Sequence, residues 1–339
     1  MRRFTTAIIL FSLCGLLPAN AIHADASEDF HHLLDEHWAT AEKEQVFFRT
    51  DADAFRLNGK LPEFTPEARA RRQAYNLEIL RRLEKIDEDS LEGQDRISFK
   101  LFLYELESEK EFYDFYSHRF PVRSSTGYHV YFAHAPGNMA FNTVEDYQKY
   151  LVSLADFPRY NRENMGLMRE GIETGYTQYC KSMEGYESTI SEFIVDDVSR
   201  SVFYAPFLEF PATVPESDRK ALAADGARLI REKVIPAYRE LYDFYTGEYA
   251  PACRTEVGIT RLEGGKEYYD YLIRFFTTTD MSPREIHDLG LSETRRIRSE
   301  MEAVIASTGF EGSFQDFLEF LRTDPQFYAS DPQDLLEKV

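Results

Sequence analysis

The sequence is poor in cysteine, in tryptophan and in positive charge. It has 3 Cys and 1 Trp among 339 residues, and 39 Lys and Arg residues stand against 59 Asp and Glu, for a formal net charge of −20. Proteins that bind nucleic acids need clustered positive charge for the phosphate backbone, and anionic lipid head groups repel an acidic surface. We therefore expect neither nucleic acid nor a membrane surface among the partners of this chain.

Long hydrophobic runs are also missing, except at the start of the chain. Arg2 and Arg3 precede an apolar stretch over 4–17, and Pro18 comes just before a small-residue pattern that ends at Ala21. This order is typical of a signal peptide, here residues 1–21, and the stretch is shorter than the roughly 20 apolar residues that a membrane anchor needs. We expect an exported protein, periplasmic or secreted, with no membrane segment after cleavage.

Cleavage after residue 21 would leave two cysteines, Cys180 and Cys253. The oxidising compartments outside the cytoplasm allow such residues to form a disulfide. Two cysteines in a chain of this size are more often buried thiols, and the sequence gives no distance between them. The sequence therefore favours two thiols and leaves the disulfide open.

The apolar content is high enough for a folded core. Hydrophobic residues make up 43% of the chain and aromatic residues 14%, with 21 Tyr and 27 Phe. Apolar residues recur at spacings of three and four, which indicates amphipathic helices. Thr65, Thr143 and Ser282 stand where a capping hydroxyl begins a helix.

These signals together predict an all-α, multi-helical fold with at most short β inserts. Helices are predicted over 28–48, 66–86, 92–117, 144–175, 184–202, 216–246, 266–276 and 283–307. Pro236 is expected to kink the helix over 216–246. One short strand is predicted at 128–132, where apolar residues alternate weakly.

The signatures of several enzyme classes are absent from this sequence. A zincin needs His-Glu-x-x-His, and none of the 8 His residues is followed by Glu. His32 and His37 are five positions apart and would point about 140° away from each other on a helix. A nucleophile elbow, a dinucleotide-binding glycine pattern, a phosphate loop and Cys-x-x-Cys are missing too. The sequence alone therefore predicts no catalytic residue and no metal ligand.

One stretch, residues 258–290, is rich in aromatic and hydroxyl side chains. Its candidates for a substrate groove are Tyr268, Tyr269, Thr278 and His287. Their hydroxyl and imidazole groups could hydrogen-bond to the backbone of a bound peptide. Aromatic core packing beside a Thr-rich helix boundary explains the same residues and is more common. Both interpretations stay open on the sequence.

Several specific motifs lie in the last quarter of the chain. They are the segment 258–265, the pair Tyr268-Tyr269, the threonines 277–279, MSPREIHDLGL over 281–291, and 309–325. With these motifs the chain resembles the bacterial proteins grouped as domain of unknown function 885 (DUF885). Weaker matches upstream extend the resemblance over nearly the whole chain after residue 21.

The resemblance implies a zinc metallopeptidase, similar in fold to the thimet-oligopeptidase and angiotensin-converting-enzyme type. In such proteins a helical shell encloses a channel that admits short peptides. The resemblance also implies a zinc ion held by His-Glu-x-x-His and a downstream Glu, in the C-terminal half of the family protein. This chain lacks that motif, so the resemblance assigns no metal ligand and no general base to any of its residues.

The end of the chain leads to the same expectation. Asp331 and Pro332 form a helix start, yet only residues 333–339 follow. We expect residues 22–339 to be the N-terminal helical portion of an exported zinc-metallopeptidase-like protein, with its catalytic C-terminal half absent. This portion would form channel wall and peptide-binding surface. It would be inactive alone, because zinc and the hydrolytic site would belong to the other half.

The alternative is a stand-alone, non-catalytic periplasmic helical binding module that keeps the groove and has lost the chemistry. A folded, cooperative monomer would favour this module, whereas a large exposed apolar face would favour the truncated protein. A third possibility, an acidic scaffold protein, rests on the net charge and explains none of the motifs in 258–325.

Overall fold

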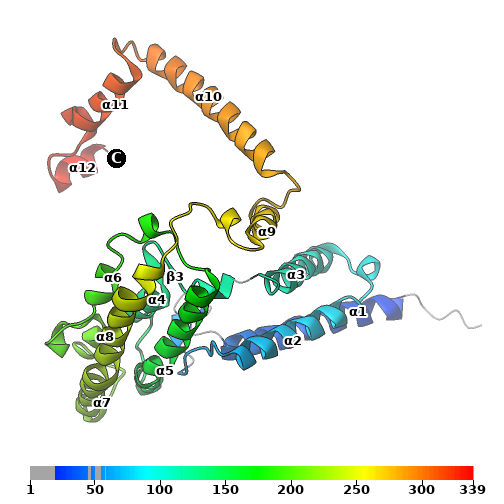
Figure 1. The fold of residues 1–339 in the computed structure, drawn as a ribbon, viewed down its shortest axis with the longest axis vertical. Coiled ribbons are helices and arrows are strands. Elements are labelled where there is room, and N and C mark those ends of the chain that lie inside the picture. Colours follow the sequence, from blue (N-terminus) through cyan, green and yellow to red (C-terminus); the bar gives the residue numbers. More distant parts are fainter. Residues whose placement is uncertain (1–19, 45–46, 50–54, 58, 116, 339) are drawn as a thin grey trace, which may run out of the picture. The chain divides into compact units, whose positions relative to one another are not determined.

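The computed structural model describes residues 20–44, 47–49, 55–57, 59–115 and 117–338. Regular structure in these residues is almost entirely helical, which confirms the predicted all-α class (Figure 1). The chain divides into two compact units, here called unit 1 (Met1–Lys266) and unit 2 (Glu267–Val339). The predicted signal peptide lies outside the described residues except for its last two positions.

Unit 1 begins with three helices that share a small hydrophobic core. They are α1 (Asn20–Glu44), α2 (Pro66–Leu83) and α3 (Gly93–Phe112). As predicted, the Thr65 hydroxyl caps α2 by accepting a hydrogen bond from the Ala68 amide at 3.1 Å. The buried side chains that form this core are Phe30, Leu33, Ile79, Leu80, Leu83, Leu91, Phe99, Phe102 and Leu106.

The larger part of unit 1 is built on one long helix, α5 (Val144–Thr174). Its predicted capping box is present, because the Thr143 hydroxyl accepts from the Asp146 amide at 3.2 Å and the Asp146 carboxylate accepts from the Thr143 amide at 2.8 Å. The helix stops at Gly175, whose φ of +77° is a left-handed conformation that glycine adopts at low cost. Two further helices pack against α5, namely α7 (Glu216–Leu229) and α8 (Ile235–Phe244).

The predicted helix over 216–246 contains two wider turns. The π-helical segments η7 (Ile230–Val234) and η8 (Tyr245–Tyr249) lie on either side of α8. Each ends two residues before a proline, Pro236 or Pro251. In an α-helix a proline ring clashes with the carbonyl four residues earlier, and the wider π turn makes room for that ring. The sequence predicted a kink at Pro236 and did not predict the π turns.

The predicted strand at 128–132 is wrong. This segment belongs to the helix α4 (Tyr128–His134). Its buried residues recur at helical spacing, and not at every second position as in a strand: they are Tyr128, His129, Phe132 and Ala133. The weak two-residue alternation of apolar residues was therefore misleading, because the segment follows the helical period.

The predicted helix over 184–202 is also wrong for most of its length. Only a single α-helical turn forms there, α6 (Ser188–Ser191). The side chain of Asp197 accepts a hydrogen bond from the Ser199 amide at 3.0 Å, and the Ser201 hydroxyl accepts from the Phe203 amide at 3.3 Å. Such local bonds give the backbone an alternative to the helix, so the chain forms short 3₁₀ turns instead.

The remaining elements of unit 1 are short. The strands of the described residues form two antiparallel pairs, β1 (Phe47–Arg49) with β2 (Phe55–Leu57) and β3 (Val122–Arg123) with β4 (Thr126–Gly127). The 3₁₀ segments are η1 (Glu88–Ser90), η2 (Ser117–Arg119), η3 (Ala135–Asn138), η4 (Cys180–Met183), η5 (Val198–Arg200), η6 (Val202–Phe207), η9 (Ala250–Ala252) and η10 (Ile259–Arg261).

Buried tyrosines connect these short segments to the long helices. Tyr150 of α5 is completely buried, and its hydroxyl donates to the Phe203 carbonyl at 3.0 Å. Tyr238 of α8 is also completely buried and donates to the His129 carbonyl at 2.7 Å. Other buried tyrosine hydroxyls donate in the same way, from Tyr147 to the Pro206 carbonyl, Tyr186 to Thr126, Tyr245 to Met183 and Tyr176 to Glu263.

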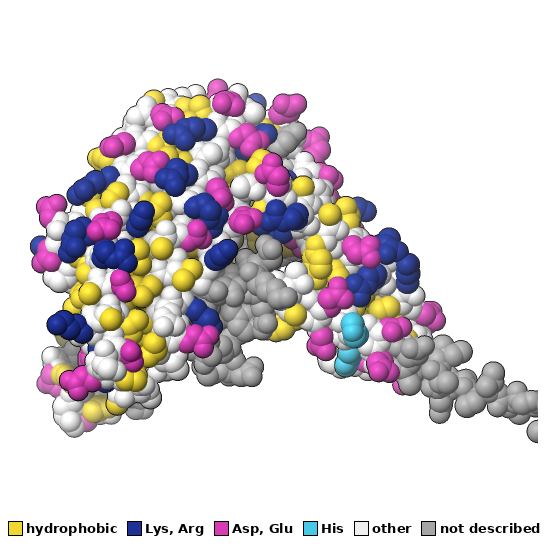
Figure 2. All heavy atoms as spheres, turned by 90° about the horizontal axis from the view of Figure 1, so that it is seen from below, with side chains coloured by type: hydrophobic (Ala, Val, Ile, Leu, Met, Phe, Trp, Pro, Cys, Tyr) yellow, Lys and Arg dark blue, Asp and Glu magenta, His cyan; other side chains and the backbone are white. Residues whose placement is uncertain are grey.

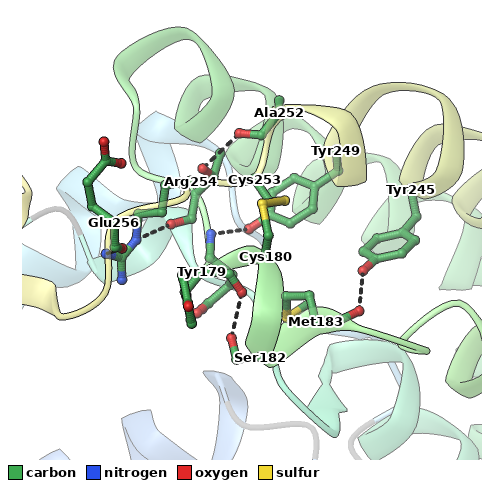
Figure 3. Close-up of a disulfide and its surroundings, with 12 residues drawn as sticks. Tyr179, Cys180, Ser182, Met183, Tyr245, Tyr249, Ala252, Cys253, Arg254 and Glu256 are labelled. Carbon is green, nitrogen blue, oxygen red and sulfur yellow. Dashed lines mark hydrogen bonds between the residues drawn. A yellow bond between two sulfur atoms is a disulfide. The ribbon is translucent and has the colours of Figure 1, made fainter.

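A disulfide joins Cys180 to Cys253, with their Cα atoms 5.1 Å apart (Figure 3). The interpretation as two thiols, which the sequence favoured, is therefore wrong. Backbone hydrogen bonds pair the same two segments, since the Cys180 amide donates to the Arg254 carbonyl at 2.9 Å and the Arg254 amide to the Gln178 carbonyl at 3.0 Å. The two cysteines are 73 positions apart in the sequence, so only the tertiary fold brings them together.

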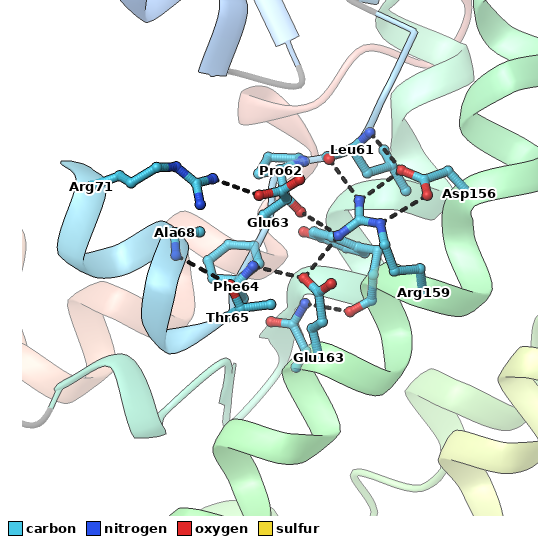
Figure 4. A network of polar contacts seen from close by, with 12 residues as sticks. Leu61, Pro62, Glu63, Phe64, Thr65, Ala68, Arg71, Asp156, Arg159 and Glu163 are labelled. Carbon is cyan, nitrogen blue, oxygen red and sulfur yellow. Dashed lines mark hydrogen bonds and ion pairs between the residues drawn. The ribbon is translucent and has the colours of Figure 1, made fainter.

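An arginine of α5 fastens the segment that leads into α2 (Figure 4). The Arg159 guanidinium pairs with Asp156 at 2.6 Å and with Glu163 at 2.8 Å, and it donates to the Leu61 carbonyl at 2.7 Å. The two carboxylates also accept from backbone amides, Asp156 from Leu61 at 3.0 Å and Glu163 from Phe64 at 2.7 Å. Both charges are thus shared between a guanidinium and an amide, which offsets the loss of water.

Unit 2 is made of helices with few buried side chains. They are α9 (Gly265–Thr277), which begins just before the boundary, α10 (Pro283–Ser307), α11 (Phe314–Thr323) and α12 (Pro332–Lys338), with the 3₁₀ segment η11 (Pro325–Phe327). The predicted start of α10 is confirmed, because Ser282 and Glu285 form a capping box. Among the described residues of unit 2, the buried hydrophobic side chains are Tyr271, Ile273 and Ile305.

The surface carries charges of both signs side by side. Figure 2 shows Lys and Arg side chains interspersed with Asp and Glu on the face that it presents. Many of them form ion pairs along a helix, such as Arg81 with Glu78 at 2.7 Å, and such exposed pairs add little stability. No helix in the described part of the chain is long and apolar enough to cross a membrane.

The substitution Tyr150→Phe tests the tyrosine bonds. It keeps the ring and removes the hydroxyl, so the buried Phe203 carbonyl loses its donor. We expect the free energy of unfolding, measured in urea, to fall by about 1–3 kcal/mol. The matched control is Tyr131→Phe, at a side chain that is 59% exposed, and it should change the value by less than about 0.5 kcal/mol. Equal effects of the two substitutions would contradict the assigned role.

His129 makes the stability of unit 1 depend on pH. Its side chain is completely buried, with Nε2 3.2 Å from the Thr189 hydroxyl and Nδ1 without a hydrogen-bond partner among the described residues. Burial lowers the pKa of His129 to about 4, from the ordinary value of 6.5 that applies in the unfolded chain. Its contribution to stability is therefore complete above about pH 6.5 and is lost as the pH falls toward 4, by about 3 kcal/mol in all.

The substitution His129→Gln should flatten this pH dependence. We expect the variant to lose less unfolding free energy than the original protein between pH 6.5 and 4, because the buried group no longer titrates. His134→Gln, at an exposed position on the same helix, should leave the pH dependence unchanged. Identical pH profiles for His129→Gln and the original protein would show that another group is responsible.

Candidate functional site

Helix α9 carries the two tyrosines that the sequence proposed for a substrate groove. Tyr268 is half-buried and stacks on Tyr271, with ring centroids 6.2 Å apart. Tyr269 is 40% exposed and makes no hydrogen bond or ring contact within the described part of the chain. Tyr268 therefore belongs partly to the packing of α9, and Tyr269 presents its ring to solvent.

The threonines after α9 form a tight turn. The Thr278 amide donates to the Arg274 carbonyl at 2.8 Å, and Thr278 has a φ of +54°. This left-handed conformation ends a helix and usually belongs to glycine, because a β-branched side chain is strained there. The hydroxyls of Thr277 and Thr278 donate to the carbonyls of Ile273 and Thr277, both at 2.7 Å. Their protons are thus used within the turn, and Thr277 Oγ1 also accepts from the Thr279 amide at 3.2 Å.

His287 lies in the first turns of α10 and is exposed. Within the described residues its side chain makes no hydrogen bond, ion pair or ring contact. Tyr268, Tyr269, Thr278 and His287 therefore all belong to unit 2. Among the described residues, no hydrogen bond connects the side chains of Tyr269, Thr278 and His287 to one another. Their role as a substrate groove stays a prediction.

Helix α10 has a feature that the sequence analysis did not single out. Four of its exposed hydrophobic residues are spaced by eight, four and three positions and so lie toward one side of the helix, while Leu291 is exposed on another side. This surface, here called the α10 stripe, consists of Leu289, Ile297, Met301 and Val304. Val304 is 63% exposed. The spacing was visible in the sequence, but it indicated only that the segment was helical and not which face would be covered.

The helices after α10 repeat this exposure. Leu335 and Leu336 of α12 are exposed. Phenylalanines of the α11 region contact one another, with centroid distances of 5.1 Å between Phe310 and Phe317 and 5.2 Å between Phe320 and Phe327. The Arg298 guanidinium of α10 lies 3.5 Å from the ring centroid of Phe314, which connects α10 to α11. These contacts cover only part of the apolar surface.

The exposed residues of α9, its turn and α10 could bind a ligand by ring stacking, hydrogen bonding and apolar contact. The described residues contain no group of three or more His, Cys, Asp or Glu side chains placed to hold a metal ion. Residues 258–290 contain aromatic rings, hydroxyls and an exposed imidazole, and a peptide can contact all three kinds of group. Larger exposed apolar patches of this kind commonly mark a binding surface or an interface.

Comparison with known proteins gives one family and one fold. The family model described as "Bacterial protein of unknown function (DUF885)" matches residues 47–339. No curated protein matches the chain. A solved structure titled "The crystal structure of the putative lipoprotein from Colwellia psychrerythraea" is similar, with a TM-score of 0.72 and 16% sequence identity. The match covers 94% of this chain but 56% of that chain, so the present chain spans little more than half the length of its structural neighbour.

Thr278→Gly tests whether the turn after α9 is held at a cost in stability. Glycine adopts a positive φ freely, so we expect the free energy of unfolding of the turn and α9 to rise by about 1 kcal/mol. Amide exchange in α9 would report the change. Thr279→Gly is the matched control, because Thr279 has no positive φ and glycine should destabilise the chain there. Weaker protection of α9 in Thr278→Gly would contradict the strain.

Proposed function

Because the chain belongs to DUF885, a family of bacterial proteins of unknown function, we propose that it is the N-terminal helical portion of an exported, zinc-metallopeptidase-like protein. In this role the helices form part of a channel wall and a surface that binds peptides. Hydrolysis then depends on residues of a C-terminal half.

The observation that carries the proposal is the exposed apolar surface of unit 2. Leucine, isoleucine, methionine and valine side chains of the α10 stripe are exposed along a 25-residue amphipathic helix. Burying a side chain of this kind stabilises the folded protein by roughly 1.5–3 kcal/mol. A helix whose apolar face stays exposed to water lacks this stabilisation. A following half of the protein that covers this stripe explains why the sequence retains it.

The comparison supports the same proposal in two ways. The structural neighbour is almost twice as long as the part matched here, which leaves room for a second half of similar size. Its title calls it a "putative lipoprotein", in keeping with the export that Arg2, Arg3 and the apolar stretch over 4–17 predict. Export also suits the disulfide between Cys180 and Cys253, since such bonds persist in oxidising compartments.

Zinc enters the proposal only through the family resemblance. The described residues do not fit a zinc site, because no three ligating side chains come together among them. We therefore derive no metal-dependent step for this chain. The part proposed for it is to bind and orient a peptide, with Tyr268, Tyr269, Thr278 and His287 as the groove residues.

The direct test of the truncated-protein proposal is to read the source DNA for about 900 bases beyond the codon for Val339, the length of a second half like the one here. An open frame that encodes His-Glu-x-x-His and a downstream Glu is the expected result. A stop codon at that point without such a motif would favour the stand-alone binding module.

The activity is tested on two proteins, the present chain and a longer DUF885 relative. After metal removal and zinc re-addition, we expect the relative to cleave short peptides and the present chain to remain inactive. In the relative, Tyr→Phe at the position of Tyr269 should raise KM and leave kcat unchanged, because it removes a binding contact. Loss of thermal stability with unchanged kinetics would assign that tyrosine to packing, and hydrolysis by the present chain alone would overturn the proposal.

A further inference from the structure

A second polar cluster lies in unit 1, among residues that the proposed function does not use. Arg69 comes from α2, His118 and Arg119 from η2, and Glu170 from the last turns of α5. Tyr113 at the end of α3 completes the cluster. Four separate elements therefore meet around two guanidinium groups and one carboxylate.

One of the two arginines has a full ion-pair partner. Arg119 is buried, and its Nε and Nη2 both lie close to Glu170 Oε1, at 2.8 and 2.6 Å. Its guanidinium also stands over the ring of Tyr176, 5.2 Å from the centroid. This pair accounts for the negative charge of Glu170.

The other arginine has no carboxylate partner among the described residues. Arg69 donates one hydrogen bond, from Nη2 to the Tyr113 carbonyl at 2.8 Å, and its guanidinium lies 5.3 Å from the centroid of the Tyr113 ring. Four of its five N–H groups make no hydrogen bond within this part of the chain. Burial lowers the pKa of Arg69, and the neighbouring Arg119 lowers it further, against opposing contributions from Tyr113 and Glu170.

The imidazole of His118 lies close enough to this arginine for the two groups to interact electrostatically. Its Nε2 lies 3.8 Å from Glu170 Oε1. Burial lowers the pKa of His118 to about 4, and the charge of Arg69 lowers it too, so the imidazole is neutral at pH 7. Arg69 and Arg119 thus share the cluster with the Glu170 carboxylate and a neutral imidazole.

An arginine without a carboxylate at ion-pair distance is unusual in a chain this acidic. The whole sequence has a formal net charge of −20, yet among the described residues Glu170 acts on Arg69 only from beyond ion-pair distance. A partly buried cation whose N–H donors have no partner is costly unless another group satisfies them. The flat fork of a guanidinium matches the two oxygens of a carboxylate better than any other common group.

We propose that Arg69 binds a carboxylate group from outside the chain, beside the Arg119–Glu170 ion pair. The side chains of His118 and Glu170 are 21% and 41% exposed, so the cluster reaches the solvent. The carboxylate belongs to a small organic acid or to the free C-terminus of a peptide, and the second source rests on the proposed peptide-binding function.

Calorimetric titration of the full chain tests this site. The probes are acetate, N-acetyl-trialanine with a free carboxylate, and the same peptide with a C-terminal amide, all at one ionic strength set with chloride. We expect the free acid to bind about tenfold more tightly than the amide, since the charged hydrogen bonds require the carboxylate. Acetate binding without peptide binding supports the site with small acids as its ligands.

Two variants of one position and a matched control complete the test. Arg69→Gln should lower the affinity for acetate or the free acid about tenfold, and Arg69→Lys, which keeps the charge but not the fork, should lose most of it as well. Arg81→Gln on the same helix, at an exposed arginine already paired with Glu78, should bind as the original protein does. Circular dichroism confirms that each variant is folded.

The proposal is overturned if neither acetate nor the free acid binds, or if folded Arg69→Gln binds as tightly as the original protein. Equal binding of the free acid and the amide also overturns it. That last result would leave the peptide-binding surface of unit 2 intact, so failure of the carboxylate site and failure of the proposed function are distinguishable.

Discussion

The structure of unit 1 depends on buried tyrosine hydroxyls that donate to backbone carbonyls. Its long helices satisfy their own backbone groups, but the short segments between them leave carbonyls that need other donors. Tyr150 and Tyr238 meet this need for Phe203 and His129 while filling the core with their rings. Burial raises the pKa of both tyrosines well above the ordinary value, which keeps each hydroxyl protonated as a donor.

The need to satisfy backbone groups outside the helices also explains the positions of the disulfide and of the Arg159 ion pairs in unit 1. The disulfide of Cys180 and Cys253 joins two irregular segments beside a bridge of backbone hydrogen bonds (Figure 3). Arg159 holds the extended segment before α2 through its carbonyl and amide groups (Figure 4). The disulfide and Arg159 each lie beside backbone groups that no helix satisfies, while α5 and α8 contribute buried side chains to the core.

Unit 2 differs from unit 1 because its helices are well capped but bury few side chains. Ser282 and Ser313 begin α10 and α11 with capping boxes, which fix where the helices start. The α10 stripe shows that capping does not by itself provide a core. This contrast supports the proposal that a further part of the protein covers the α10 stripe.

Helix starts and the fold class could be predicted because they are local: a hydroxyl at Thr65, Thr143 or Ser282 acts on amides within three residues. The strand predicted at 128–132 failed because four buried positions of α4 obey a helical period that the neighbouring glycine and prolines obscure. The disulfide and the Arg69 cluster could not be predicted, because residues far apart in sequence create them. The π turns follow from Pro236 and Pro251, a local signal whose consequence depends on the surrounding packing.

Unit 1 has its own hydrophobic core, and we propose that the exposed apolar surface of unit 2 is covered by a partner surface. Amide hydrogen exchange of the isolated chain tests it most directly. The account predicts slow exchange in α5 and α8, where buried tyrosines anchor the helices, and much faster exchange in α10, whose hydrogen bonds border an exposed apolar stripe. Protection of α10 equal to that of α5 would contradict the account, because it would mean that unit 2 is stable without any further part of the protein.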